Sequence, residues 1–120
     1  MVRYTFDRTL RLLSRDQYDK VFKSPVRAST PNILVLAAAN DGQAPRLGLI
    51  IPKKVLKRAV WRNRIKRVIR ETFRLNQHQL PNIDIVIVAK SKIGELSNSE
   101  LSMTLVKLWQ QVSLRLTNRQ

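Results

Sequence analysis

The residues with the clearest chemical potential form a dense basic segment at 57–74, "KRAVWRNRIKRVIRETFR", in which eight of eighteen residues are Lys or Arg. Ten of the 23 basic residues of the chain lie between Lys53 and Arg74, and Glu71 is the only acidic residue in that interval. Arginine binds phosphate through two parallel hydrogen bonds, so a concentration of it suits a phosphate-rich partner. The segment therefore predicts a polyanion-binding surface.

A solvated helix face is the alternative explanation of these charges. Such a face normally intersperses Glu with Lys or Arg at i,i+4 spacing, which stabilises a helix by a few tenths of a kcal/mol per pair. That pattern is missing from 57–74. Asn63, on the cationic side, adds a donor and an acceptor that could contact a base or a sugar hydroxyl. We therefore favour nucleic-acid binding.

The charge of the whole chain leads to the same class of partner. Only 8 acidic residues oppose the 23 basic ones, which leaves a net charge of +15 and a pI near 11.5. Self-repulsion of this size opposes folding unless a polyanion neutralises it.

A non-enzymatic RNA-binding module, such as a ribosomal protein or RNA chaperone, would use the same helix. A DNA-binding regulator would need base-reading side chains and usually a dimer seam, and neither is evident.

The sequence offers little for independent catalysis. It has no cysteine and one histidine, which excludes a thiol nucleophile, a disulfide framework and a zinc ribbon. Its carboxylates are scattered and form no D-x-D or D-x-x-x-E cluster of the kind that two-metal nucleases use. With no signal-peptide core and no run of about 18 apolar residues, we expect a cytoplasmic protein without a membrane contact.

Local patterns predict the elements that position the basic segment. A capping box from Ser14 to Gln17 opens a helix over 14–24. Short apolar runs at 26–29, 32–39 and 46–52 predict three strands, the last two as a hairpin. After Pro52 the period becomes helical, and the apolar stripe of this second helix consists of Trp61, Ile65, Val68, Ile69 and Thr72, with Phe73 at its margin.

Two further elements complete the chain. The β-branched run at 83–90 predicts a strand covered on both faces, at the centre of the sheet. A second capping box, from Ser97 to Glu100, opens a final helix with apolar residues at helical spacing, among them Trp109. We assign Trp61 and Trp109 to the core, and His78 to a surface connection.

The element order is therefore αβββαβα in a single domain over 1–120. We expect an α/β sandwich in which helices pack against a mixed four-stranded sheet. If the strands at 46–52 and 83–90 are parallel neighbours, general rules predict a right-handed crossover through the basic helix.

Two aromatic residues lie one turn apart on the first helix. Tyr18 and Phe22 could stack unpaired bases beside a basic sheet. They could equally belong to the core, since periodicity alone does not distinguish the two roles.

The basic segment resembles the arginine-asparagine-arginine motif of the protein component of bacterial ribonuclease P, the ribonucleoprotein that removes 5′ leaders from precursor tRNA. The similarity extends over nearly the whole chain. "RLLSRDQYDKVF" resembles the family's N-terminal segment, "RLGLIIPKK" the strand before the motif and "LPNIDIVIVAK" the strand after it. These matches occur in the family's order.

The resemblance implies a ribosomal protein S5 domain 2-like fold with a left-handed crossover at the motif helix. It also implies that the RNA subunit carries the active site and its magnesium ions, and that the protein is an accessory subunit, one per RNA, without catalytic or metal-binding residues. The residues that would face the catalytic RNA are Lys53, Lys54, Arg58, Arg62, Asn63, Arg64, Lys66, Arg67 and Arg70.

A second surface follows from the same resemblance. In the family, a cleft between the first helix and the sheet contacts the single-stranded leader of precursor tRNA. The matching aromatic residues here are Tyr18 and Phe22. The oligomeric state of the free protein and the preferred precursor substrates do not follow from the resemblance.

Overall fold

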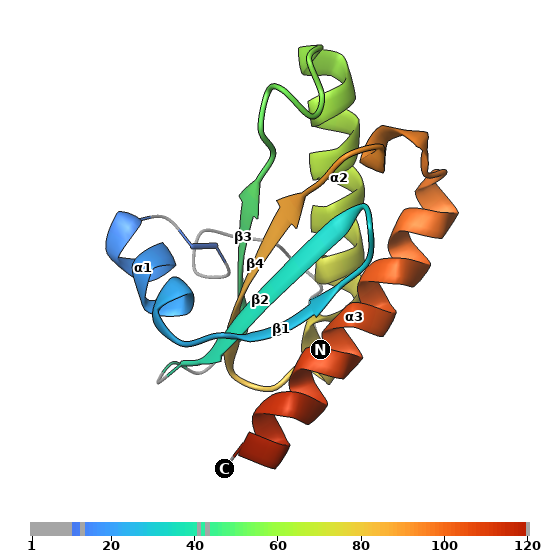
Figure 1. Ribbon diagram of the computed structural model, residues 1–120. Coiled ribbons are helices and arrows are strands. Elements are labelled where there is room, and N and C mark those ends of the chain that lie inside the picture. The colour runs from blue at the N-terminus through green and yellow to red at the C-terminus, as the bar shows by residue number, and fades with distance from the viewer. Residues whose placement is uncertain (1–10, 13, 41, 43, 120) are drawn as a thin grey trace.

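The computed structural model describes residues 11–119 except 13, 41 and 43. Its elements follow the expected αβββαβα order, with two short 3-10 turns added (Figure 1). They are α1 (Arg15–Lys23), β1 (Val26–Ser29), β2 (Ile33–Ala39), β3 (Arg46–Ile50), α2 (Ala59–Asn76), η2 (Gln77–Gln79), β4 (Ile83–Ala89), η3 (Ile93–Glu95) and α3 (Asn98–Arg119).

The four strands form one mixed sheet in the order β1-β2-β4-β3. β2 pairs antiparallel with both β1 and β4, whereas β3 pairs parallel with β4. The predicted hairpin of the second and third strands is therefore wrong, and the hairpin is formed by β1 and β2. The turn-forming residues after β2 would suit a hairpin, but β4 inserts between the two strands and takes their backbone hydrogen bonds.

The central position predicted for β4 is confirmed. Six of its seven residues are buried, because helices cover both faces of the sheet at this strand. In Figure 1 β3 and β4 run upward, β4 lies to the right of β3, and α2 lies behind the sheet, so the crossover is left-handed. The right-handed expectation is wrong. A right-handed connection would place α2 on the α1 face and remove it from the core that it shares with α3.

The larger core lies between the sheet and the pair α2 and α3. The buried stripe of α2 consists of Ile65, Val68, Ile69, Thr72 and Phe73. The predicted apolar stripe of α3 is buried as well, and it consists of Leu101, Leu105, Leu108, Trp109, Val112 and Leu116. The predicted capping box at its start is present, since Ser97 N donates to Glu100 Oε1 at 2.9 Å and Glu100 N donates to Ser97 Oγ at 3.1 Å.

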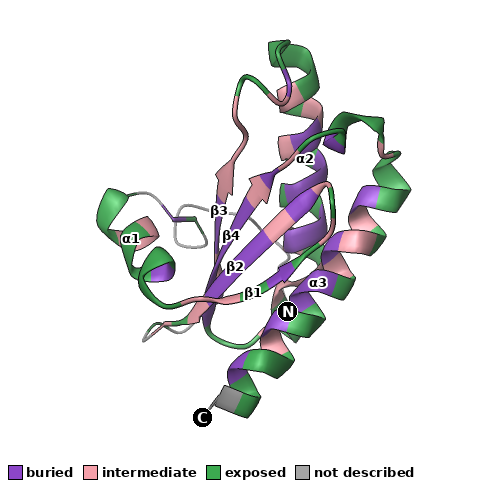
Figure 2. Cartoon of the chain, in the orientation of Figure 1, coloured by how far each residue is buried: buried purple, intermediate pink, exposed green. Residues whose placement is uncertain are grey.

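A smaller core lies on the opposite face, under α1. The predicted capping box of α1 is confirmed, with Ser14 and Gln17 exchanging backbone-to-side-chain hydrogen bonds. Val21 of α1 is fully buried, and Leu12 packs into the same cluster. Figure 2 shows that α1 is otherwise largely exposed, so it covers only part of this face of the sheet.

The two tryptophans have different environments. Trp109 is 1% exposed and meets Phe73 edge-on, with 6.0 Å between ring centroids, so its assignment to the core is confirmed. Trp61 is 48% exposed, and its assignment to the core is wrong. The first turns of α2 extend beyond the upper ends of the strands in Figure 1, so the apolar stripe continues there without a sheet to cover it. No helix in the described part of the chain has a stretch apolar enough to span a bilayer.

Candidate nucleic-acid interface

The outer face of α2 carries a shallow groove lined entirely by polar and charged side chains. It has a volume of about 280 Å³ and is lined by Asn63, Lys66, Arg67, Arg70, Glu71 and Arg74. We call these six residues the cationic groove. Their helical spacing places them opposite the buried stripe, so the packing of α2 on the sheet presents them to solvent.

Most of the charge in the cationic groove is not neutralised within the protein. In the described part of the chain, the side chains of Lys66, Arg67 and Arg70 form neither an ion pair nor a hydrogen bond with another protein group. Glu71 is paired with Arg74, and this hydrogen bond lowers the pKa of Glu71 and raises that of Arg74. The three remaining cations are available for an external anion.

The loop that enters α2 extends the positive surface. Lys53, Lys54, Lys57 and Arg58 are all exposed on it. The loop leaves the end of β3, whose last residue Ile50 is only three positions before Lys53. It therefore leads from the edge strand β3 to α2, on the face of the sheet that α2 covers.

Arg62 has a different environment from the arginines of the cationic groove. Its Nη1 donates to the carbonyl oxygens of Leu56 at 2.7 Å and Lys57 at 2.9 Å. The side chain turns back over the first turn of α2 and holds the preceding loop. Arg62 keeps its positive charge, but its Nη1 group already donates to two carbonyl oxygens of the protein.

Arg64 holds the segment between β4 and α3. Its Nη2 donates to Gly94 O at 3.0 Å, and its Nη1 donates to Asn98 Oδ1 at 2.7 Å. Both nitrogens also approach Leu96 O at 3.4 Å. Among the residues expected to contact RNA, Arg62 and Arg64 are thus the two whose guanidinium groups also brace the protein.

The predicted aromatic pair lies on the opposite face of the sheet. Tyr18 is half-buried, and its hydroxyl accepts a hydrogen bond from Leu49 N at 3.3 Å. Phe22 is 43% exposed, and the two ring centroids are 6.4 Å apart with a tilt of 31°. Tyr18 therefore contacts the sheet, while the ring of Phe22 projects into solvent.

Three half-buried aliphatic residues of the sheet continue this surface and were not identified from the sequence. Leu34, Ile50 and Val88 pack around the small core under α1, and Val88 is the register partner of both others. We call them, with Tyr18 and Phe22, the aromatic surface. The uniformly apolar run of β4 conceals which of its residues is partly exposed. Gly48 could have indicated this surface from the sequence, because a glycine inside a strand often marks a place where another group packs closely on the backbone.

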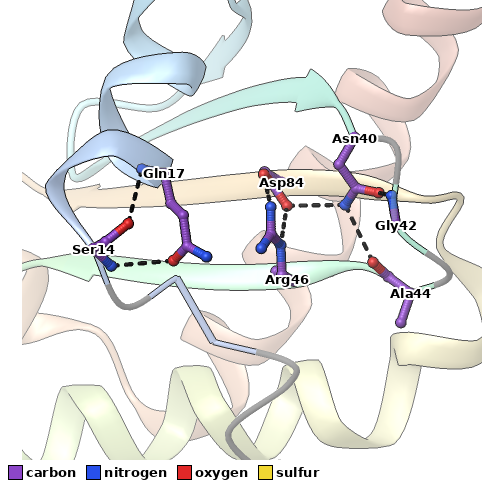
Figure 3. A network of polar contacts seen from close by, with 7 residues as sticks. All are labelled: Ser14, Gln17, Asn40, Gly42, Ala44, Arg46 and Asp84. Atoms are coloured by element: carbon purple, nitrogen blue, oxygen red, sulfur yellow. Dashed lines mark hydrogen bonds and ion pairs between the residues drawn. The ribbon is translucent and has the colours of Figure 1, made fainter.

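An ion pair anchors the same face at the lower end of β3. Asp84 is 4% exposed and accepts from Arg46 Nε at 2.8 Å, Arg46 Nη2 at 2.7 Å and Asn40 Nδ2 at 2.9 Å (Figure 3). The hydrogen bonds to Asp84 raise the pKa of Arg46. Asn40 also binds Ala44 O and Gly42 N, so this network ties the turn after β2 to the centre of the sheet.

The fold and these two surfaces define an α/β-sandwich protein of the nucleic-acid-binding class. Residues 6–113 match the family model described as Ribonuclease P. The chain therefore belongs to the ribonuclease P protein family.

Relatives and solved structures agree with this assignment. The proteins described as "Ribonuclease P protein component" from Haemophilus influenzae strains PittGG and 86-028NP are each 56% identical over 110 residues, which is 92% of this chain and 92% of each relative. The RNase P protein of Thermotoga maritima has a TM-score of 0.76 at 28% identity, covering 85% of this chain and 96% of its own. That of Staphylococcus aureus has a TM-score of 0.80 at 23% identity, covering 87% and 97%, and shows the shared fold.

The expected family and fold are thus confirmed. The chain is the protein component of an endoribonuclease, and its partner is the RNA subunit of that enzyme.

Proposed function

We propose that this chain uses its two surfaces for two different RNAs of one complex. The cationic groove, with the exposed loop before α2, binds the catalytic RNA, and the aromatic surface binds the 5′ leader of precursor tRNA. The observation that carries this proposal is the set of three cations, Lys66, Arg67 and Arg70, for which the described part of the chain supplies no acidic partner. The protein assists removal of the leader, and the RNA performs the chemistry.

The cationic groove acts by neutralising phosphate charge. Each phosphate that a Lys or Arg neutralises releases condensed counterions, so binding strengthens as salt is lowered. Arg67 and Arg70 are exposed and three positions apart on the helix, so their guanidinium groups can contact neighbouring phosphates. The bound protein then reduces repulsion between the catalytic RNA and an approaching precursor tRNA.

The aromatic surface acts on unpaired bases. The ring of Tyr18 packs on the same small core as the half-buried Leu34, Ile50 and Val88, and the ring of Phe22 lies next to that of Tyr18. A base stacked on an aromatic side chain contributes about 1–3 kcal/mol and needs no particular sequence. A surface of this kind suits the varied leaders of precursor tRNAs better than base-specific hydrogen bonds would.

Three carboxylates in the described part of the chain are already engaged by protein groups and do not suit a catalytic magnesium site. Asp84 is bound by Arg46 and Asn40, Glu71 is paired with Arg74, and Glu100 caps α3. The described residues contain no group of three His, Asp or Glu side chains placed to hold a metal. We therefore assign the magnesium ions of the reaction to the RNA subunit. We further propose that one copy of the protein binds each RNA subunit and that the complex acts in the cytoplasm.

The proposal is tested by reconstitution. The chain is mixed with a ribonuclease P RNA and a precursor tRNA, and leader removal is followed at low and high magnesium. We expect the wild-type chain to accelerate cleavage at low magnesium, and the double variant Arg67→Ala, Arg70→Ala to do so far less. The control, Lys107→Ala with Arg115→Ala, removes two exposed charges from α3. Failure of the wild-type chain to assist cleavage would instead favour a non-enzymatic RNA-binding module.

A further inference from the structure

A second groove, which shares no lining residue with the cationic groove or the aromatic surface, lies at the N-terminal end of α2. Its volume is about 840 Å³, within the roughly 300–1,000 Å³ range of ligand pockets. One wall is the loop before α2, represented by Val55 and Leu56, and the other is the segment from Lys92 to Glu100. The segments that form these two walls, the green loop that enters α2 and the orange turn that precedes α3, are at the top of Figure 1. Trp61 lies between the walls.

Both walls are held by residues that flank Trp61 on the helix. Arg62 binds the carbonyl oxygens of Leu56 and Lys57 on one side. Arg64 binds Gly94 O and Asn98 Oδ1 on the other. The walls also touch, since a Cβ at Gly94 would come within 2.9 Å of Leu56 Cδ2. Specific contacts within the protein therefore hold both walls of the groove.

The indole of Trp61 is presented to this groove. It is 48% exposed, and the guanidinium carbon of Arg58 lies 5.3 Å from its ring centroid, in the range of a cation–π contact. That contact orients the ring without burying it. An oriented, half-exposed indole beside a groove is the arrangement that proteins use to stack an unpaired base.

The charges around the groove indicate how a nucleotide would lie in it. Lys57 and Arg58 are exposed on the loop side, where they favour a phosphate. The other wall carries charges of both signs. Glu95 and Glu100 would repel a phosphate, Lys92 would attract one, and the Arg64 guanidinium is engaged with Gly94 O and Asn98 Oδ1. The loop side therefore favours a phosphate more than this wall does. A base therefore fits in the groove with its phosphate toward the loop.

We infer that this groove binds one unpaired nucleotide of the catalytic RNA, stacked on Trp61 with its phosphate near Lys57 and Arg58. The inference rests on the proposed binding of that RNA by the cationic groove. The stacking contact at Trp61 would add to the charge-dependent contact that the cationic groove makes with the same RNA.

Affinity for the ribonuclease P RNA tests the inference. We expect Trp61→Ala to weaken binding by roughly 5- to 150-fold, the effect of losing one stacked base. Trp61→Phe keeps a ring and should retain most of the affinity. Val60→Ala, which removes part of an adjacent, 66% exposed apolar side chain, should bind as the wild type does. Equal losses for Trp61→Ala and Val60→Ala would overturn the inference.

Fluorescence gives a second measurement that does not depend on the catalytic RNA. Oligo(A) should quench the emission of the wild-type chain, an RNA duplex of the same length should quench it much less, and Trp61→Phe, which retains only Trp109, should respond to neither. Equal quenching by the single strand and the duplex would contradict a site for an unpaired base. A concentration-dependent dimer that Trp61→Ala abolishes would assign the groove to a second copy instead.

The double variant Arg67→Ala, Arg70→Ala separates the two proposals. If it binds the RNA weakly while Trp61→Ala binds as the wild type does, the nucleotide site is wrong and the proposed function stands. If both bind as the wild type does, the proposed function is wrong as well.

Discussion

Tyr18 of α1 packs so closely on Gly48 of β3 that a Cβ at position 48 would lie 2.7 Å from Tyr18 Cε1. The hydroxyl of Tyr18 also accepts a hydrogen bond from the next backbone amide, Leu49 N, at 3.3 Å. The position of the aromatic surface therefore depends on the missing side chain at Gly48. Any larger residue must displace the ring or the helix that carries it.

The first prediction follows from this contact. Gly48→Ala should lower the free energy of unfolding by about 1–3 kcal/mol, the usual cost of overpacking. Because the Tyr18 ring must move, precursor tRNA should bind more weakly, while the affinity for mature tRNA should stay unchanged. The companion variant Tyr18→Phe keeps the ring and should bind precursor tRNA nearly as the wild type does. Equal losses for precursor and mature tRNA would contradict a contact with the leader.

The second prediction concerns the ion pair of Arg46 and Asp84. Asp84→Ala leaves the Arg46 guanidinium without its main partner, and breaking a buried pair typically costs about 3–5 kcal/mol. Because the Arg46 side chain remains 28% exposed, we expect a loss near the lower limit, about 3 kcal/mol. Chemical denaturation measures it. The double variant Arg46→Met, Asp84→Leu should recover much of the lost stability, and a failure to recover would mean that the hydrogen bonds of Asn40 dominate the network.

The third prediction separates cations that bind RNA from an arginine that braces the protein. If Arg67 contacts one phosphate, Arg67→Ala should weaken RNA binding and reduce the slope of log affinity against log salt by about 1. The melting temperature of Arg67→Ala should remain that of the wild type, because no described protein group forms a hydrogen bond or ion pair with the Arg67 side chain.

Arg64→Ala should behave in the opposite way. It loses the hydrogen bonds to Gly94 O and Asn98 Oδ1, so the free energy of unfolding should fall by roughly 1–2 kcal/mol. The salt slope should change less than in Arg67→Ala. A large change in slope with unaltered stability would show that the Arg64 guanidinium leaves its carbonyl partners to bind phosphate.

The fourth prediction concerns pH. The pKa of Glu100 lies below its ordinary value of 4.5, mainly because the backbone N–H of Ser97 donates to the ionised carboxylate. A group with a lowered pKa in the folded state stabilises the protein above its unfolded pKa and loses that contribution as pH falls through the folded pKa. Glu100→Gln cannot titrate. The difference in melting temperature between wild type and Glu100→Gln should therefore shrink from about pH 6 to about pH 3. A difference in melting temperature that does not change with pH would contradict the lowered pKa of Glu100.

Local patterns in the sequence were sufficient for the type and order of the helices and strands. The two capping boxes, at Ser14 and Ser97, begin helices where expected, because a cap depends on residues three positions apart. The cationic side of α2 follows from helical periodicity, and the buried stripe of the helix follows with it, except at Trp61.

Tertiary structure decided everything that depends on partners distant in the chain. β4 separates β2 from β3 because strand pairing joins residues tens of positions apart, which local periodicity does not encode. Trp61 is exposed because α2 begins beyond the ends of the strands, and Arg64 is engaged because η3 and α3 return to that end of the helix. The sequence alone determined which residues are charged, apolar or helical, since those properties are local. Which of them meet a neighbour and which stay open to RNA depends on the packing of remote segments.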